Sequence, residues 1–235
     1  MPAEPRNDIT GLLLVDKPQE WTSHDVVNCI KHQFRVKKIG HCGTLDPMAT
    51  GLLVVLLGKA TKLQERLMGE SKVYEGALRL GVETDSEDST GEVIAEHDAS
   101  HVTREQLLSA MASLTGEISQ VPPMVSAIRK NGRHLYDLAR KGITVEREPR
   151  KVTIHSFELL SCSLPEATYR VHCSKGTYIR TLCADIGRKL ECGGIMTALR
   201  RVRCGGFEVK EAVGMQDVKS WSLEELSSHV IWPVE

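Results

Sequence analysis

The fold and the function can both be approached from one stretch of sequence, Ile39-Gly40-His41-Cys42-Gly43-Thr44-Leu45-Asp46-Pro47-Met48-Ala49-Thr50-Gly51. Its three glycines and one proline are typical of a loop with unusual backbone angles. Six apolar residues, Leu52–Leu57, follow directly and predict a buried strand. The pattern therefore predicts a polar loop held against the protein interior. Asp46 lies inside this loop, and an aspartate before proline either caps its own turn or serves a function, so both interpretations stay open here.

The length of 235 residues suits one large domain or two small ones, and we expect a single domain that spans residues 1–235. No run of about 18 apolar residues predicts a membrane span, and the polar segment 1–10 does not resemble a secretory signal. The seven cysteines are never closer than nine residues apart, which excludes a Cys-x-x-Cys pair and does not resemble a disulfide framework. We expect a reduced, cytoplasmic protein.

The formal net charge of −1 conceals an uneven distribution of charge. The segment 83–98 holds seven carboxylates and no Lys or Arg, and without these carboxylates the net charge becomes +6. Eight Lys or Arg face three acids over 129–151, and seven face two acids over 175–203. Such regions are either solvated faces or surfaces that neutralise phosphates.

Hydrophobic periodicity predicts the remaining elements. Strands are expected over 11–15, 72–80, 150–160, 167–173 and 205–209. Helices are expected after the capping pairs Thr22/Asp25 and Thr103/Gln106, over 61–68, from Gly176-Thr177 onward, and over 223–228. Strands and helices interleave without a βαβ rhythm, so we predict an α+β fold around a mostly antiparallel sheet.

Two segments of this pattern are predicted to lie outside the regular elements. The acidic stretch 84–91 is expected to be a solvated loop. The basic stretch 121–151 is bounded by Pro122-Pro123 and Pro149 and has a single short helical piece over 135–141, which is typical of a functional flap.

The sequence lacks the motifs that would indicate a nucleotide cofactor or a metal site, and it argues against a thiol nucleophile. No phosphate-binding Gly-x-x-x-x-Gly-Lys-Ser/Thr loop and no strand-linked Gly-x-Gly-x-x-Gly occurs, so no nucleotide cofactor is implied, and we expect no metal site. A thiol nucleophile at His41-Cys42 is disfavoured, because adjacent residues rarely point at one another.

Asp46 and a helix start with Tyr178 and Arg180 are the remaining candidates. An arginine in the first helical turn opposes the helix dipole by a few tenths of a kcal/mol, so it is better tolerated when it faces an anion. Arg180 is either a surface arginine or the partner of a carboxylate or phosphate. If it reaches Asp46, it keeps that carboxylate ionised and ready as a nucleophile or base.

The motifs, in their order along the chain, resemble those of the TruB family of tRNA pseudouridine synthases. The segment Gly40–Gly51 is similar to the family's active-site motif. Further segments similar to family motifs are Gly11–Pro18 with Thr22–Asp25, Tyr74 with Leu78–Gly81 and Thr84-Asp85, Ser126-Ala127 with Gly132, Leu135-Tyr136 and Ala139–Gly142, Cys173–Thr181, and Leu199–Val202. The resemblance runs from about Gly11 to Phe207.

The resemblance implies a pseudouridine-synthase fold with a thumb-like insertion at about 121–151. It also implies isomerisation of the uridine at position 55 in the T loop of tRNA, by base flipping and without a cofactor. Asp46 would be the catalytic residue. The implied substrate-binding residues are His41 in the space that the T loop vacates, Tyr74 stacked on the uracil, Arg180 paired with Asp46, Tyr178 and Leu199 in the base pocket, and Lys17 in support.

One departure from the family and two alternatives follow. Relatives usually carry a carboxyl-terminal RNA-binding domain of the PUA type, which we expect to be absent here. We expect a monomer that binds the T arm of tRNA. The alternatives are a tRNA-folding chaperone that uses the same basic surface and a guide-RNA-dependent pseudouridine synthase.

Overall fold

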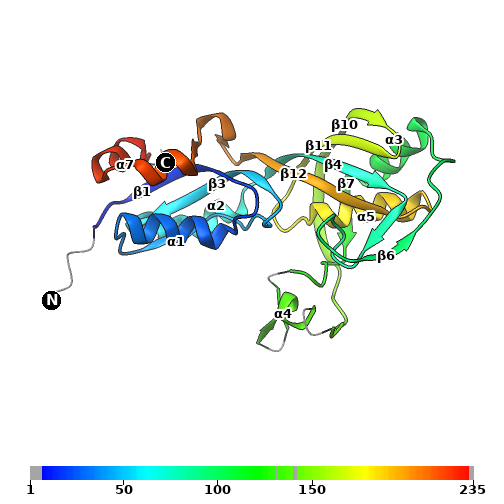
Figure 1. Ribbon diagram of the computed structural model, residues 1–235, viewed down its shortest axis with the longest axis horizontal. Helices are drawn as coiled ribbons and strands as arrows, with labels where there is room; N and C mark the ends of the chain where they lie inside the picture. The colour runs from blue at the N-terminus through cyan, green and yellow to red at the C-terminus, as the bar shows by residue number, and fades with distance from the viewer. Residues whose placement is uncertain (1–6, 127, 131, 140–141, 233–235) are drawn as a thin grey trace. The chain divides into compact units, whose positions relative to one another are not determined.

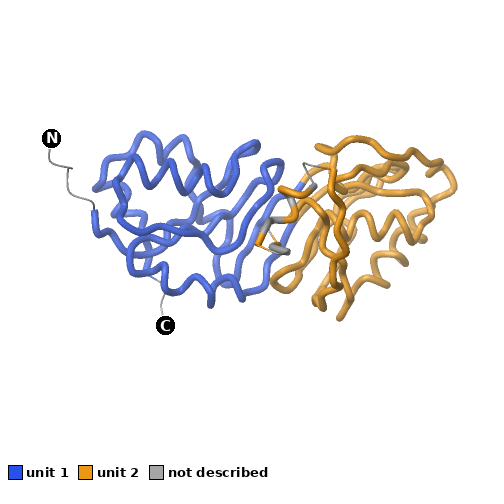
Figure 2. The backbone as a smooth tube through the Cα atoms, turned by 90° about the horizontal axis from the view of Figure 1, so that it is seen from below, with its two compact units in different colours: residues 1–74, 199–235 blue, residues 75–198 orange. Residues whose placement is uncertain are grey.

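The computed structural model describes residues 7–126, 128–130, 132–139 and 142–232. Ala127, Arg140 and Lys141, which belong to the motifs and the helical piece expected in the flap, lie outside the described residues. The chain forms two compact units, residues 1–74 with 199–235 (unit 1) and residues 75–198 (unit 2) (Figure 2). Each unit is described below by itself.

Unit 1 is a sheet with helices packed against it (Figure 1). Its central strand β3 (Thr50–Leu57) pairs antiparallel with β1 (Gly11–Lys17) and β2 (Ile39–His41), and parallel with β12 (Gly194–Cys204). The remaining elements of this unit are α1 (Ser23–Gln33), the 3-10 helix η1 (Gly58–Leu63), α2 (Gln64–Gly69), β13 (Phe207–Glu208), the 3-10 helix η2 (Val209–Glu211), β14 (Val213–Gly214), α6 (Met215–Ser220) and α7 (Leu223–His229).

Both faces of β3 are covered, which explains its unbroken apolar sequence. On one face, Leu53, Val55 and Leu57 pack in a cluster with residues of α1, α6 and α7. On the other face, Leu52, Val54 and Leu56 pack with residues of β1 and α2. The strand predicted over 52–57 is therefore confirmed as a buried strand with no polar face.

Unit 2 contains a second part of the sheet, in the strand order β4 (Lys72–Leu80), β11 (Glu166–Cys173), β10 (Arg150–Ser163) and β7 (Gly116–Gln120). The strands β4 and β12 contribute residues to both units. The helices α3 (Arg104–Ser113) and α5 (Ile179–Lys189) and the hairpin of β5 (Val82–Thr84) with β6 (Val93–Glu96) complete the unit. The flap carries β8 (Arg129–Lys130), β9 (Arg133–His134) and α4 (Leu135–Ala139).

The predicted α+β class with a mostly antiparallel, mixed sheet is confirmed. Both capping boxes form at the expected residues, and β4 has the predicted bounds. Two details differ from the prediction. The last strand spans only Phe207–Glu208, not 205–209, before a 3-10 turn, and α6 was not anticipated.

The acidic segment 84–91 is also not the solvated loop that its composition predicted. Thr84, Ser86 and Asp88 are buried, because they hydrogen-bond within the segment and lie against α5. In the part of the chain that the structure describes, no helix has the length and apolar character needed to cross a membrane.

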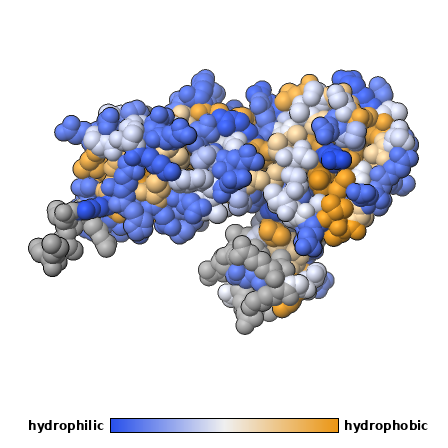
Figure 3. All heavy atoms as spheres, in the orientation of Figure 1, coloured by the Kyte–Doolittle hydropathy of each residue, from blue (hydrophilic) through white to orange (hydrophobic). Residues whose placement is uncertain are grey.

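One face of the molecule shows where polar and apolar residues lie on each unit (Figure 3). In the view of Figure 3, hydrophilic residues are spread over unit 1, whereas apolar residues gather on part of unit 2. Val93 and Ile94 of β6 are among the exposed apolar residues of unit 2.

Candidate active site

The loop between β2 and β3 is attached to unit 1 on both sides of Asp46. Leu45 and Ala49 are buried, and Leu45 N donates to Ser23 Oγ at 2.8 Å. Ala49 N donates to Asp46 O at 3.0 Å, which closes a turn that begins at Asp46 and has Pro47 and Met48 at its centre. The Asp46 side chain is half-buried between two fixed apolar residues. The loop thus holds a carboxylate at the surface in a restricted position.

Lys17, at the end of β1, lies beneath this loop and is fully buried. Its Nζ donates to the carbonyls of Trp21 at 2.5 Å, Pro18 at 2.9 Å and Pro47 at 3.3 Å. Burial lowers the pKa of Lys17 to about 8, while the Asp46 carboxylate acts in the opposite direction. Lys17 therefore supports the loop through Pro47 and lies close enough to Asp46 to interact with its charge.

His41 and Cys42 begin the loop, and neither behaves as an ionised group. Burial, followed by the charge of Arg201, lowers the pKa of His41, which favours the neutral imidazole. Burial raises the pKa of the Cys42 thiol to about 12, so it stays protonated at neutral pH. The thiol-nucleophile interpretation therefore loses its chemical basis, because only the thiolate is a strong nucleophile.

Tyr74 on β4 and Leu199 on β12 are both buried residues of unit 1, with exposed fractions of 9% and 8%. Unit 1 thus contains five of the seven predicted site residues, namely Lys17, His41, Asp46, Tyr74 and Leu199. Tyr178 and Arg180 belong to unit 2. The pairing of Arg180 with Asp46 joins residues of different units and stays a prediction.

The start of α5 is fixed by a side chain from β7. Tyr178 N donates to Gln120 Oε1 at 2.8 Å, and Gln120 Nε2 donates to Tyr178 O at 3.1 Å. The helix begins at Ile179, after Tyr178 as its N-cap, and so starts later than the predicted Gly176-Thr177. Arg180 lies in the first turn, as expected.

Arg180 is a buried side chain, not a surface arginine. Its Nη1 donates to Ser86 O at 3.1 Å and lies 3.5 Å from Asp88 Oδ2, and its Nη2 donates to Val125 O at 2.8 Å. Asp88 was not among the predicted site residues, because it is one carboxylate in an acidic run. The signal that could have identified it is its position between Ser86 and Thr90, whose hydroxyls both donate to Asp88 Oδ1.

Among the residues that the structure describes, no group of three or more His, Cys, Asp or Glu side chains is placed to hold a metal ion. His97 and His101 are four residues apart, which on a helix would place both on one face. They lie outside the helices, and His97 bonds Glu83 Oε1 at 3.0 Å while His101 bonds Leu190 O at 3.3 Å.

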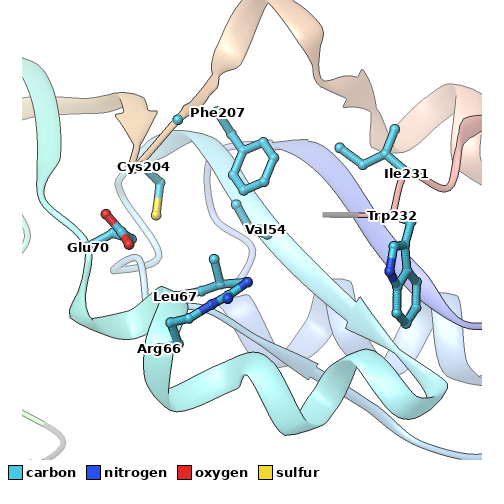
Figure 4. A pocket seen from close by; sticks show the side chains of 10 residues that line it. Val54, Arg66, Leu67, Glu70, Cys204, Phe207, Ile231 and Trp232 are labelled. Carbon is cyan, nitrogen blue, oxygen red and sulfur yellow. The ribbon is translucent and has the colours of Figure 1, made fainter. Parts of the chain in front are cut away.

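A separate hollow of about 630 Å³ lies in unit 1. In Figure 4, Val54, Leu67, Phe207 and Ile231 surround it, with Arg66, Glu70 and Trp232 at its sides. None of its lining residues belongs to the predicted site.

Two family models match the chain from residue 31 to residue 235. A model described as "TruB family pseudouridylate synthase (N terminal domain)" matches residues 31–179, which is more than half of the chain. The chain belongs to the TruB family. A second model, "tRNA pseudouridylate synthase B C-terminal domain", matches residues 180–235. The two models therefore meet inside the first turn of α5, between Ile179 and Arg180.

Several relatives of this chain share the name tRNA pseudouridine synthase B. A protein named tRNA pseudouridine synthase B from Syntrophotalea carbinolica is 49% identical over 217 residues, which cover 92% of this chain and 71% of the relative. Another with that name, from Opitutus terrae, is 44% identical over 228 residues, which cover 97% of this chain and 95% of the relative.

Two solved structures share the fold of this TruB-family chain. A Cbf5-Nop10-Gar1 complex has a chain with a TM-score of 0.73 and 29% identity, and an H/ACA RNP bound to a substrate RNA has one with a TM-score of 0.70 and 28% identity. The similarity covers 94% and 95% of this chain but 59% of each of those chains.

Proposed function

We propose that this chain is a tRNA pseudouridine synthase that isomerises the uridine at position 55 in the T loop, with Asp46 as its catalytic residue. The name of the relatives at 44–49% identity supports the substrate. The observation that supports the site is the restricted Asp46 carboxylate above the buried ammonium of Lys17. A fixed anion beside a cation is suited to act as a nucleophile or base at neutral pH.

The reaction moves one bond within the nucleotide. The Asp46 carboxylate either attacks the ribose carbon C1′ or removes a proton from the ribose, and the bond between C1′ and uracil N1 breaks. The detached uracil turns within the pocket, and its C5 forms the new bond to C1′ as the bond between Asp46 and C1′ breaks or, on the other route, as the ribose regains its proton. The proton that C5 carried passes to water and N1 takes up a proton from water, so no oxidant, reductant or cofactor is consumed.

The remaining predicted residues bind the flipped base in this proposal. Extrusion of the uridine costs a few kcal/mol, which contacts with the pocket must supply. Tyr74 stacks on the uracil, Tyr178 and Leu199 line the pocket, and His41 enters the space that the T loop vacates. Arg180 pairs with Asp46, and its contact with Asp88 restricts the guanidinium.

Binding of the T arm is proposed for the basic flap, residues 121–151. An enzyme that recognises a folded RNA loop needs cations for phosphates more than a sheet of exposed aromatic rings. The chain has only ten Phe, Trp and Tyr residues, which agrees with recognition of shape. We propose that the protein acts in the cytoplasm as a monomer, with residues 1–235 as one catalytic domain and residues 121–151 as its thumb.

The test is release of tritium from tRNA that carries [5-³H]uridine. We expect the wild-type protein to release tritium without an added cofactor and Asp46→Asn to release none while it still binds the tRNA. The control is Asp217→Asn, the same chemical change at an exposed position of α6. Full activity of Asp46→Asn would refute the proposed role.

The same assay separates the alternatives. A guide-RNA-dependent enzyme would be inactive on bare tRNA and would need an added RNA. A tRNA-folding chaperone without catalysis would accelerate tRNA refolding while no pseudouridine forms with either protein. The chaperone activity can coexist with catalysis, in which case Asp46→Asn retains it.

A further inference from the structure

Arg201 is buried beside the loop that carries Asp46. Only 1% of it is exposed, and it is among the largest fully buried side chains of the described chain. It lies on β12, where it pairs with Gly51 of β3. A buried arginine is uncommon unless its guanidinium is well satisfied, so its contacts are informative.

The guanidinium of Arg201 holds both ends of the Asp46 loop. Its Nε donates to Leu52 O at 2.7 Å, and its Nη2 donates to Gly43 O at 3.1 Å. Gly43 lies three residues before Asp46 and Leu52 six residues after it. One planar, rigid group therefore sets the separation of the two points between which the loop is suspended.

The preceding residue, Arg200, also contacts the end of this loop, and it joins Thr50 to Asp16 of β1. Arg200 donates to both carboxylate oxygens of Asp16, at 3.0 and 2.6 Å, and to Thr50 Oγ1 at 3.3 Å. Successive side chains of a strand point to opposite faces, so the two arginines reach the loop and its neighbour β1 from different sides. Arg201 is the buried member, since the Arg200 side chain remains 41% exposed.

The charge of Arg201 acts on the same group of residues. Its guanidinium contributes to lowering the pKa of both Lys17 and His41, whereas Asp46 raises that of Lys17. Two buried cations, Lys17 and Arg201, thus lie close enough to interact with each other, and Lys17 also interacts with the Asp46 carboxylate. Positive charge in a partly desolvated site favours the ionised form of a neighbouring acid.

We propose that Arg201 is a positioning residue, which fixes the Asp46 carboxylate by holding Gly43 and Leu52 and helps to keep it ionised. This inference rests on the proposed function, in which Asp46 performs the chemistry. It assigns the role to hydrogen bonds with the loop backbone, and Arg201 itself does not touch the substrate.

The test compares Arg201→Lys and Arg201→Met in multiple-turnover and single-turnover assays of tritium release. Lysine keeps the charge but cannot span both carbonyls, so we expect kcat to fall about 10- to 100-fold with KM within about twofold, as for a small misplacement of a catalytic group. The acidic limb of its pH–rate profile should stay in place. Arg201→Met also removes the charge, and its acidic limb should move to higher pH because Asp46 becomes harder to ionise.

The matched controls are Arg104→Lys and Arg104→Met, at an exposed position in the first turn of α3. These should retain the wild-type kcat and pH profile. A kcat within twofold of wild type in Arg201→Lys, a loss confined to KM, or an unmoved acidic limb in Arg201→Met would overturn the inference.

Folding and function are separated by two further measurements. If tryptophan fluorescence shows that Arg201→Met is unfolded, two other measurements test the positioning role. These are the kcat of Arg201→Lys and the recovery of kcat in Arg201→Ala when methylguanidinium is added. Rescue of kcat in Arg201→Ala and not in Asp46→Asn supports positioning, and absence of rescue in a folded Arg201→Ala contradicts it. An inactive wild-type protein would refute the proposed function itself, so the two failures are distinguishable.

Discussion

Replacement of Gly51 by alanine tests whether the close approach of β3 and β12 fixes the loop. Gly51 has φ +99°, and a Cβ built on it would lie 2.4 Å from Arg201 O and 2.8 Å from Arg201 N. Both atoms belong to the backbone, so the contact cannot be relieved by rotation of a side chain. The two strands must separate, or the residue must change its φ and with it the path of the loop.

The two costs can be estimated separately. A non-glycine residue at positive φ costs roughly 1–2 kcal/mol. An overlap that forces a backbone shift in a packed region costs about 1–3 kcal/mol. We therefore expect Gly51→Ala to lower the free energy of unfolding by about 3 kcal/mol, which for a chain of this size lowers Tm by about 6–12 °C.

The assay is thermal and urea unfolding followed by tryptophan fluorescence. All three tryptophans, Trp21, Trp221 and Trp232, belong to unit 1, so the signal reports the unit that contains the substitution. The control is Gly206→Ala, whose added Cβ would meet nothing within 4 Å, and it should unfold within about 1 °C of wild type. A Gly51→Ala protein as stable as this control would refute the reasoning.

Three further outcomes are expected. Asp88→Asn should lower the free energy of unfolding of unit 2 by about 2 kcal/mol and should lower kcat, because the buried Arg180 loses an anion. Far-UV circular dichroism measures the stability and tritium release measures kcat, with Glu96→Gln on exposed β6 as the control. A stability and a kcat equal to those of wild type would contradict this expectation. Native protein at pH 8 should react with iodoacetamide at Cys29 and Cys162, while the buried Cys42 stays unmodified and activity persists. Mass spectrometry identifies the modified cysteines. Loss of activity in proportion to modification of Cys42 would show that its thiol has a role. In an NMR titration, His41 should titrate below its ordinary pKa of about 6.5. Its contribution to stability is therefore fully present above pH 6.5 and is lost as pH falls through the lower pKa of the folded state. A midpoint at or above 6.5 would be inconsistent with the burial of its ring.

Much of the framework could be predicted from local sequence because the determining interactions are local. The alternation of Tyr74, Gly76, Leu78 and Leu80 reflects one covered face of a strand, and β4 has the predicted bounds. A capping box is closed by residues three positions apart, so Thr22 with Asp25 could be recognised without knowledge of the fold. The apolar run 52–57 likewise carries its own evidence of burial on both faces.

The site could be predicted only in part, because its supporting contacts join residues that are distant in the chain. Asp88 lies in a segment whose composition is that of a solvated loop, and its burial depends on Arg180, 92 residues later. Burial of either charge alone would cost several kcal/mol, so neither residue indicates from its own surroundings that it is inside. The same holds for Arg201, which bonds the carbonyls of Gly43 and Leu52, and carbonyl groups carry no sequence signature. The motif Leu199–Val202 includes Arg201 but does not indicate what the side chain contacts, and that role is revealed by a buried arginine whose hydrogen bonds end on the backbone of the loop that carries Asp46.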